Sequence, residues 1–184
     1  MTQTHKEENK LDKKVNIVKF PKNTTKFYLL DQKQDWVKEL LLELNEKAQE
    51  HSQEFYLENS HLNIQLTLTK SYNKEFGDVL FCKGSVKSLF TTQCVRTLQE
   101  MQDSLDFSFM SCFVDKSLKN NEDLLEHMEV YEDQNIYDAY FQEKGFADIY
   151  EMIHEQIYLN INQYPILDPD SPLPWATDGP KIKQ

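Results

Sequence analysis

The feature that most constrains the fold is a period of two in the stretch HLNIQLTLTK, residues 61–70. Apolar side chains alternate there with polar ones, at Leu62, Ile64, Leu66 and Leu68. Successive side chains of a β-strand point to opposite faces, so this alternation is typical of a strand that is buried on one face. A long strand-like run follows at 79–94, where Gly84 predicts a bulge or bend, and the alternation returns at 105–113. Three consecutive strands of this kind predict an antiparallel meander.

Two other segments show the three- and four-residue spacing of an amphipathic α-helix. In residues 35–51 the apolar side chains recur at this spacing, and Asp35 stands where an N-cap residue accepts hydrogen bonds from the first turn. Residues 148–163 begin with Asp148 and Glu151, which have the capping-box spacing with an acid at the cap. The meander and these helices together predict an α+β fold, with an antiparallel β-sheet flanked by two amphipathic helices.

Composition divides the chain into three parts. Residues 1–14 are polar and rich in lysine without hydrophobic periodicity, which predicts a disordered basic arm. Residues 168–184 are rich in proline and predict an extended tail, in which Trp175 is the side chain expected to dock. Residues 15–167 form the predicted single α+β domain. Within it, the acidic residues 115–145 are harder to interpret: NNEDLLEHMEVYED, residues 120–133, leaves a short helix and a loop open, and NIYDAYFQEKG, residues 135–145, is compatible with one further strand.

Charge is distributed unevenly along the chain. The net charge is −11, which argues against a generic nucleic-acid-binding protein because such proteins are normally basic. Residues 1–38 and 60–98 nevertheless carry net charges of +4 and +3, whereas residues 39–59 and 99–156 carry −5 and −12. At physiological salt, exposed charges more than about 8 Å apart are largely screened from each other. A local cationic face is therefore compatible with the acidic total.

Sequence features also bear on the compartment. No apolar run approaches the roughly 18–20 residues that span a bilayer, and the polar start lacks the apolar segment of a secretory signal. The three cysteines are an odd number without short regular spacing, which indicates reduced thiols rather than a disulfide framework. We therefore expect a cytoplasmic protein without membrane contact.

The basic segment between residues 60 and 98 contains the candidate RNA-binding side chains, which are Lys70, Lys74, Lys83, Lys87 and Arg96. Lys83, Ser85 and Lys87 share the outward parity of their strand, so they are expected to form a cationic row on its solvent face. Such side chains contact phosphates in RNA-binding proteins. The alternative is that surface lysines only keep the sheet soluble and protect its edges. The lysines of the basic arm leave the same two alternatives, an RNA contact or a solvated tail.

Cys94 lies at the end of the second predicted strand, without a second cysteine two or three residues away. A structural zinc site built from short loops requires such closely spaced ligands. If the corner of the hairpin centres near residue 100, Cys112 faces position 88 and not Cys94. A reactive thiol requires a cationic, half-exposed setting; Arg96 is compatible with one, but no histidine is close in sequence. The favoured interpretation is a small side chain that packs at a strand end.

Other chemical motifs are missing from the sequence. Glu151 and His154 have the spacing of one metal-binding pair on a helix, but no second Glu-x-x-His occurs. The chain has only four glycines and no phosphate-binding loop, G-x-S-x-G or H-E-x-x-H motif. We therefore expect no catalytic residue, metal, cofactor or small-molecule substrate.

Two stretches resemble one known family. VLFCKGSVKSLFTTQCVRTLQEMQDSLDFSFMSCFV is similar to the central segment of the YceD family, the large ribosomal RNA subunit accumulation proteins of bacteria and plastids. That segment combines a strand with a central glycine, a C-x-R-C motif and a strand rich in aromatic residues, and Gly84, Cys94 and Arg96 match it here. GFADIYEMIHEQIYLNINQYPI is similar to the family's acidic stretch and amphipathic helix, with Asp148 and Pro165 on matching positions.

The resemblance covers roughly residues 78–167 and departs from the family at Thr97, where members usually carry the second cysteine. A metal or redox role of that cysteine pair is therefore in doubt here. The resemblance implies a non-enzymatic factor that supports synthesis, processing or stability of large-subunit (23S) rRNA, with the rRNA or a pre-ribosomal particle as partner. The alternative is an acidic protein-interaction module that binds a basic ribosomal or assembly protein without RNA contact.

Overall fold

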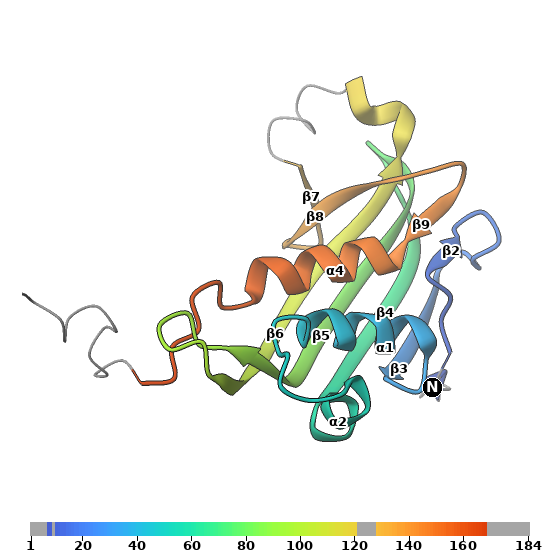
Figure 1. Ribbon diagram of the computed structural model, residues 1–184. Helices are drawn as coiled ribbons and strands as arrows, with labels where there is room; N and C mark the ends of the chain where they lie inside the picture. The colour runs from blue at the N-terminus through green and yellow to red at the C-terminus, as the bar shows by residue number, and fades with distance from the viewer. Residues whose placement is uncertain (1–6, 9, 121–127, 169–184) are drawn as a thin grey trace, which may run out of the picture.

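The computed structural model describes residues 7–8, 10–120 and 128–168. Within these residues the chain forms a seven-stranded sheet in the order β1-β3-β4-β5-β6-β8-β7 and a two-stranded sheet of β2 and β9 (Figure 1). The strands are β1 (Glu7–Glu8), β2 (Lys14–Asn16), β3 (Thr24–Asp31), β4 (His61–Asn73), β5 (Gly77–Gln93), β6 (Glu100–Asp115), β7 (Glu129–Glu132), β8 (Asn135–Gln142) and β9 (Phe146–Asp148). The helices are α1 (Asp35–Leu44), α2 (Gln53–Asn59) and α4 (Ile149–Asn160), with a 3₁₀-helix, η1 (Lys116–Asn120).

Strands β4, β5 and β6 form the antiparallel meander that the alternating sequence predicts. In the middle of β5, Gly84 pairs with Leu66 of β4 on one side and with Phe109 of β6 on the other. β3 adds antiparallel to β4, whereas β1 pairs in parallel with β3 and β8 in parallel with β6. The predicted α+β fold with a largely antiparallel sheet is confirmed.

Helices α1 and α4 cover one face of the large sheet (Figure 1). The alternating leucines and isoleucine of β4 belong to the core on this face and are at most 1% exposed. Helix side chains complete this core, among them Trp36, Val37, Leu40, Leu41, Met152, Ile153 and Ile157. A second, smaller cluster lies toward the β7–β8 end and contains Phe76, Val79, Phe81, Cys112, Val114, Val130, Tyr137 and Ala139. Because neighbouring residues of a strand point to opposite faces, the two clusters lie on opposite faces of the sheet.

Helix boundaries differ from the predicted ones at the end of both predicted helices, whereas the start of the last helix agrees. α1 ends at Leu44 and not at residue 51, because the Asn45 side chain turns back and donates to the carbonyl of Leu41 at 2.6 Å. The N-cap position is Gln34 and not Asp35. The sequence analysis did not predict α2, whose N-cap Ser52 accepts a hydrogen bond from the Phe55 N–H.

The start of α4 has the predicted cap. Asp148 is the N-cap residue, and its Oδ1 accepts a hydrogen bond from the N–H of Glu151 at 3.1 Å. The helix ends at Asn160, three residues before the predicted end. None of the helices in the described parts of the chain combines the length and the apolar composition needed to cross a membrane.

The predicted disordered arm, residues 1–14, is wrong for its second half. Leu11 is only 6% exposed, and its carbonyl accepts a hydrogen bond from the Trp36 indole N–H at 2.8 Å. Lys14 begins β2, which pairs with β9. One apolar side chain that fits the core therefore orders a segment whose composition is otherwise that of a solvated arm. Residues 1–6 and 9 of the predicted arm lie outside the described residues, as does the predicted tail after Asp168, including Trp175.

Between residues 115 and 145 the structure decides among the open alternatives where it describes the chain. Residues 135–142 form the strand β8, which confirms the further strand. Residues 129–132 form the strand β7, within the stretch 120–133 for which a helix or a loop was expected, so neither alternative holds for them. A short 3₁₀-helix, η1, follows β6 directly. The choice between helix and loop for residues 121–127 falls outside the described residues.

Gly84 does not form the predicted bulge, since the ladders on both sides run through it without interruption. Its role is spatial. The ring of Phe109 lies over the glycine, and an added Cβ at position 84 would lie 2.5 Å from its Cε1 atom, far inside van der Waals contact. Phe109 is only 6% exposed and belongs to the core beneath the helices. A glycine is required at this position because the ring occupies the space of a side chain.

We predict that Gly84→Ala destabilises the protein by about 1–3 kcal/mol, because the Phe109 ring must leave its place in a packed core. Phe109→Leu removes the clash, so the two changes combined cost less than the sum of the single variants. Equilibrium denaturation by urea measures all three free energies of unfolding. Ser85→Ala, next to Gly84 and on the other face, is the control; additive single effects would contradict the steric explanation.

Candidate nucleic-acid interface

The face of the sheet opposite α1 and α4 is the candidate interface. In the central rows of β3 to β6 it carries Thr25, Phe27, Leu29, Gln65, Thr67, Lys83, Ser85, Lys87, Asp106, Ser108 and Met110, and we call this set the open face. These residues are exposed or half-buried, whereas most of their neighbours along each strand are buried. Figure 1 shows the three helices on the other side of these strands. The strand pairing therefore presents a polar surface next to a packed core.

Two of the predicted RNA-binding residues, Lys83 and Lys87, lie on the open face as the strand parity predicts, and both are exposed. The ammonium group of Lys83 is 5.6 Å from the ring centroid of Tyr137. Lys87 Nζ lies 3.0 Å from Oδ2 of Asp106, its partner across the β5–β6 ladder. Since the side chains of this pair are 65% and 69% exposed, the pair contributes only about 0–1 kcal/mol and yields easily to another anion.

Lys70 must be removed from the predicted RNA-binding set. It points to the helix-covered side, its side chain is 3% exposed, and its Nζ donates to the carbonyl of Ile17 at 2.8 Å. Asp78 Oδ2 lies 3.4 Å from the same nitrogen. The lysine therefore ties the segment before β3 to the β4–β5 hairpin. The sequence contained the signal for this, because Lys70 shares the parity of the buried residues Leu62 to Leu68.

Lys74 and Arg96 lie at opposite ends of β5. Lys74 is exposed in the turn that joins β4 to β5, and Arg96 is half-buried in the corner between β5 and β6. A strand of the length of β5 spans about 55 Å at about 3.3 Å per residue, so these two side chains cannot belong to one compact patch. Of the five predicted residues, the structure brings only Lys83 and Lys87 together on the open face.

The corner between β5 and β6 is built around the Cys94 side chain. The N–H of Cys94 donates to the carbonyl of Gln99, and its carbonyl accepts from the N–H of Leu98, both at 2.9 Å. The segment after α4 docks here: Val95 donates its N–H to the carbonyl of Pro165, and the N–H of Leu167 donates to the Cys94 sulfur at 3.4 Å. The corner therefore fastens the chain after α4 to the hairpin.

The hydrogen bonds at this corner change the acidity of the thiol. Donation from the Leu167 N–H, from the hydroxyl and N–H of Thr97 and from the Arg96 N–H lowers the pKa of Cys94 to about 6, against an opposing effect of burial. With a pKa of about 6, Cys94 is a thiolate at neutral pH. Its side chain is only 1% exposed, however, and is therefore shielded from reagents. Thr97, where the family usually has its second cysteine, thus stabilises the thiolate through a hydrogen bond.

The other two cysteines lie apart from this corner. Cys112 pairs with Phe81 and not with position 88, because the hairpin turns earlier than expected. Burial raises the pKa of Cys82, and burial raises that of Cys112 to about 12. The two lie in different clusters, on opposite faces of the sheet. Within the described residues, the cysteines therefore do not converge on one site.

The positions that carry the family resemblance have architectural roles. Gly84 makes room for Phe109, Asp148 caps α4, and Cys94 and Pro165 join the corner to the segment after the helix. The sequence analysis did not identify Phe27 and Met110, two apolar side chains of the open face; the continuous apolar run of β3 does not show which of its side chains face outward.

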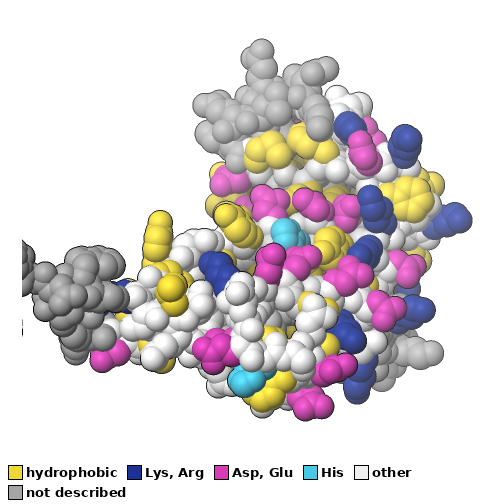
Figure 2. Space-filling view, viewed as in Figure 1, with side chains coloured by type: hydrophobic (Ala, Val, Ile, Leu, Met, Phe, Trp, Pro, Cys, Tyr) yellow, Lys and Arg dark blue, Asp and Glu magenta, His cyan; other side chains and the backbone are white. Residues whose placement is uncertain are grey.

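The face of the sheet that the helices cover differs from the open face in its charge. Figure 2 shows acidic side chains gathered over the helices on this face, with Lys and Arg toward one edge. A groove of about 840 Å³ opens between α4 and the α1–α2 segment. Its lining includes the buried apolar residues Leu40, Leu44, Ala48 and Ile157 and the polar or charged residues Glu43, Glu46, Lys47, His51 and His154. The groove therefore lies between parts of the two acidic segments, residues 39–59 and 99–156.

By fold, the chain is an α+β protein with helices on one face of a long-stranded antiparallel sheet and a polar surface on the other. A family model described as "Large ribosomal RNA subunit accumulation protein YceD" matches residues 82–183, more than half of the chain. The chain belongs to the YceD family, as the resemblance of its corner and last helix predicts. Searches among curated proteins and among solved structures found no match.

We predict that the Cys94 thiolate makes the stability of the protein depend on pH. Its folded pKa of about 6 lies below the ordinary thiol value of 9.0, so its contribution to the free energy of unfolding is fully present above pH 9 and disappears as the pH falls through 6. The stability of the wild type relative to Cys94→Ser should therefore rise between pH 6 and 9, as measured by urea denaturation. Cys82 and Cys112 are present in both proteins, so their contributions to the pH dependence cancel in the difference. A difference that is constant with pH would contradict the thiolate.

Proposed function

We propose that the protein is a cytoplasmic, non-enzymatic factor that supports synthesis, processing or stability of large-subunit (23S) rRNA and contacts the RNA directly through the open face. Membership of the YceD family links the chain to accumulation of the large ribosomal RNA subunit. The observation that carries the RNA contact is the position of Lys83 and Lys87, four residues apart on the same face of β5, on a polar sheet face opposite the acidic helices.

The chemistry of the open face suits single-stranded or irregular RNA. Lysines bind phosphates, flat or polarizable side chains such as Phe27 and Met110 offer surfaces on which bases stack, and hydroxyl groups such as that of Ser108 bond to base edges and 2′-hydroxyls. Met110 is 37% exposed and lies directly across the ladder from Lys83. A phosphate that replaces Asp106 beside Lys87 costs little, because the exposed pair is weak.

We predict that Lys83→Ala combined with Lys87→Ala weakens binding to large-subunit rRNA fragments and reduces its salt dependence. Loss of two phosphate contacts to single-stranded RNA lowers the slope of log affinity against log salt by about 1.4, at about 0.7 per contact. Filter binding between low and physiological salt measures both quantities. Lys38→Ala, an exposed lysine on α1, is the matched control. An unchanged affinity and slope in the double variant would remove the open face as the RNA site.

A second candidate function is a protein-interaction module that binds a basic ribosomal or assembly protein without RNA contact. The groove between α1–α2 and α4 supports it, because an apolar floor with acidic side chains beside it fits an amphipathic helix with a basic face. Glu43 is engaged within the protein, since His154 Nε2 lies 3.1 Å from its Oε2 and the Tyr150 hydroxyl donates to its Oε1 at 3.0 Å. Glu46 is exposed beside it.

We predict that Glu46→Lys weakens binding of a short Lys/Leu amphipathic peptide several-fold, because it reverses a charge at the groove. Fluorescence anisotropy with the labelled peptide measures the affinity in the absence of nucleic acid. Glu58→Lys, an exposed acid on α2 that does not line the groove, makes the same change of net charge and is the control. Equal weakening by both variants would indicate general charge attraction and exclude the groove.

A further inference from the structure

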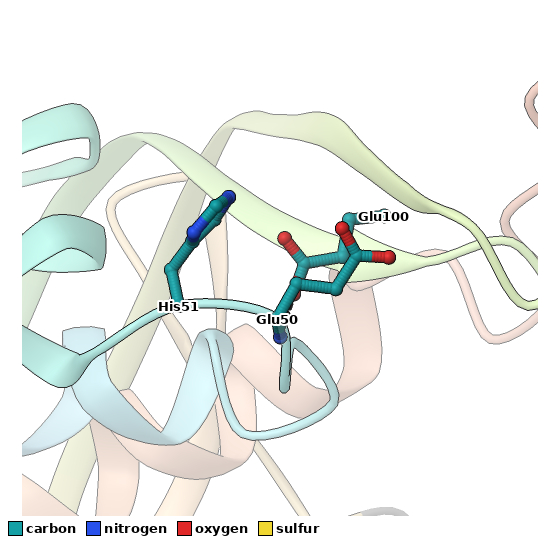
Figure 3. Close-up of side chains that lie close together, drawn as sticks. All are labelled: Glu50, His51 and Glu100. Atoms are coloured by element: carbon teal, nitrogen blue, oxygen red, sulfur yellow. Dashed lines mark hydrogen bonds between the residues drawn. The ribbon is translucent and has the colours of Figure 1, made fainter.

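Three side chains from two distant parts of the chain meet beside α2. Glu50 and His51 lie in the loop between α1 and α2, and Glu100 is the first residue of β6 (Figure 3). One imidazole nitrogen and one oxygen of each carboxylate all lie within 4.8 Å of one another. His51 is exposed, so a ligand from solvent reaches the group directly.

We propose that Glu50, His51 and Glu100 form a binding site for a divalent transition-metal ion of the Zn²⁺ class. One imidazole and two carboxylates are a donor set that Zn²⁺ accepts, with the fourth position open to water. Tetrahedral bonds of about 2.1 Å place the donors about 3.4 Å apart. The widest spacing therefore has to contract by up to about 1.4 Å. Glu50 and His51 lie in a loop, outside the helices and the sheet, where such a movement disturbs neither.

A buried tyrosine holds the Glu100 carboxylate and the backbone of His51. Tyr56 is only 3% exposed; its hydroxyl donates to the Glu100 carboxylate and accepts the backbone N–H of His51 at 2.9 Å. The backbone N–H of Glu50 donates to Glu100 Oε1 at 2.8 Å. Outer hydrogen bonds of this kind fix metal ligands and raise affinity. The hydroxyl of a buried tyrosine therefore holds the Glu100 carboxylate in place, which distinguishes this group from acidic side chains that only share an exposed surface.

Electrostatics favours a cation at the same place. Burial raises the pKa of the Glu100 carboxyl, but hydrogen bonds from Tyr56 and from the backbone of Glu50 and Gln49 outweigh it, so its pKa lies below the usual value. Glu100 is therefore ionised at neutral pH beside the Glu50 carboxylate, and two neighbouring negative charges gain from a cation between them. A bound ion would tie the α1–α2 loop to the start of β6, next to the groove that His51 and Tyr56 also line.

Titration of the full-length protein with Zn²⁺ in competition with a chromophoric chelator tests the site. We expect one tight equivalent in the wild type and at least about tenfold weaker binding in Glu50→Gln and His51→Ala, which remove ligands from an exposed loop. Tyr56→Phe keeps the three ligands and removes only the orienting hydroxyl, and we expect about tenfold weaker binding. Zn²⁺ should also raise the melting temperature of the wild type more than that of Glu50→Gln.

Two controls locate the ion. His61→Ala removes an exposed histidine at the start of β4, and Cys94→Ser removes the corner thiolate; neither should change the affinity. Circular dichroism confirms that each variant is folded. The proposal is overturned if the wild type does not compete with the chelator, if Glu50→Gln binds Zn²⁺ like the wild type, or if Cys94→Ser is the variant that loses it. This site does not depend on the proposed RNA contact, so either can fail alone.

Discussion

The register of β5 between β4 and β6 is the constraint on which the rest of the structure depends. A shift by one residue would exchange the two faces of the strand, moving Lys83 and Lys87 into the core and Val86 into solvent. Gly84 opposes such a shift, because the Phe109 ring needs the empty space above a glycine. The same pairing therefore sets the packing beneath the helices and the row of lysines on the open face.

The corner at the end of this hairpin shows how the family's motif serves architecture in this chain. The sulfur of Cys94 is held by N–H groups of its own turn and of Leu167, and Thr97 contributes a hydroxyl where the family usually has a thiol. The corner joins the chain after α4 to the sheet.

The two faces of the sheet carry different charge, and this difference gives the proposed RNA contact a direction. Acidic side chains over the helices repel phosphates, whereas the open face offers Lys83 and Lys87. An acidic protein of this kind can approach RNA with the open face toward the RNA. The helix-covered face and its groove then point away from the RNA and stay accessible to a basic partner. The proposed RNA contact and the proposed groove contact use separate surfaces.

The sequence by itself determined the features that depend on near neighbours in the chain: the alternation of β4, the meander, the Asp148 cap and the outward parity of Lys83 and Lys87. The sequence also predicted the fold class. Of the five predicted RNA-binding residues, however, only Lys83 and Lys87 lie together on the open face in the structure. Tertiary structure alone decided the burial of Leu11, the parallel addition of β8, the pairing of Cys112 with Phe81, and the meeting of His51 with Glu100. These depend on which distant segments pack together and in which register, and that choice rests on free energies of burial that a local pattern does not contain.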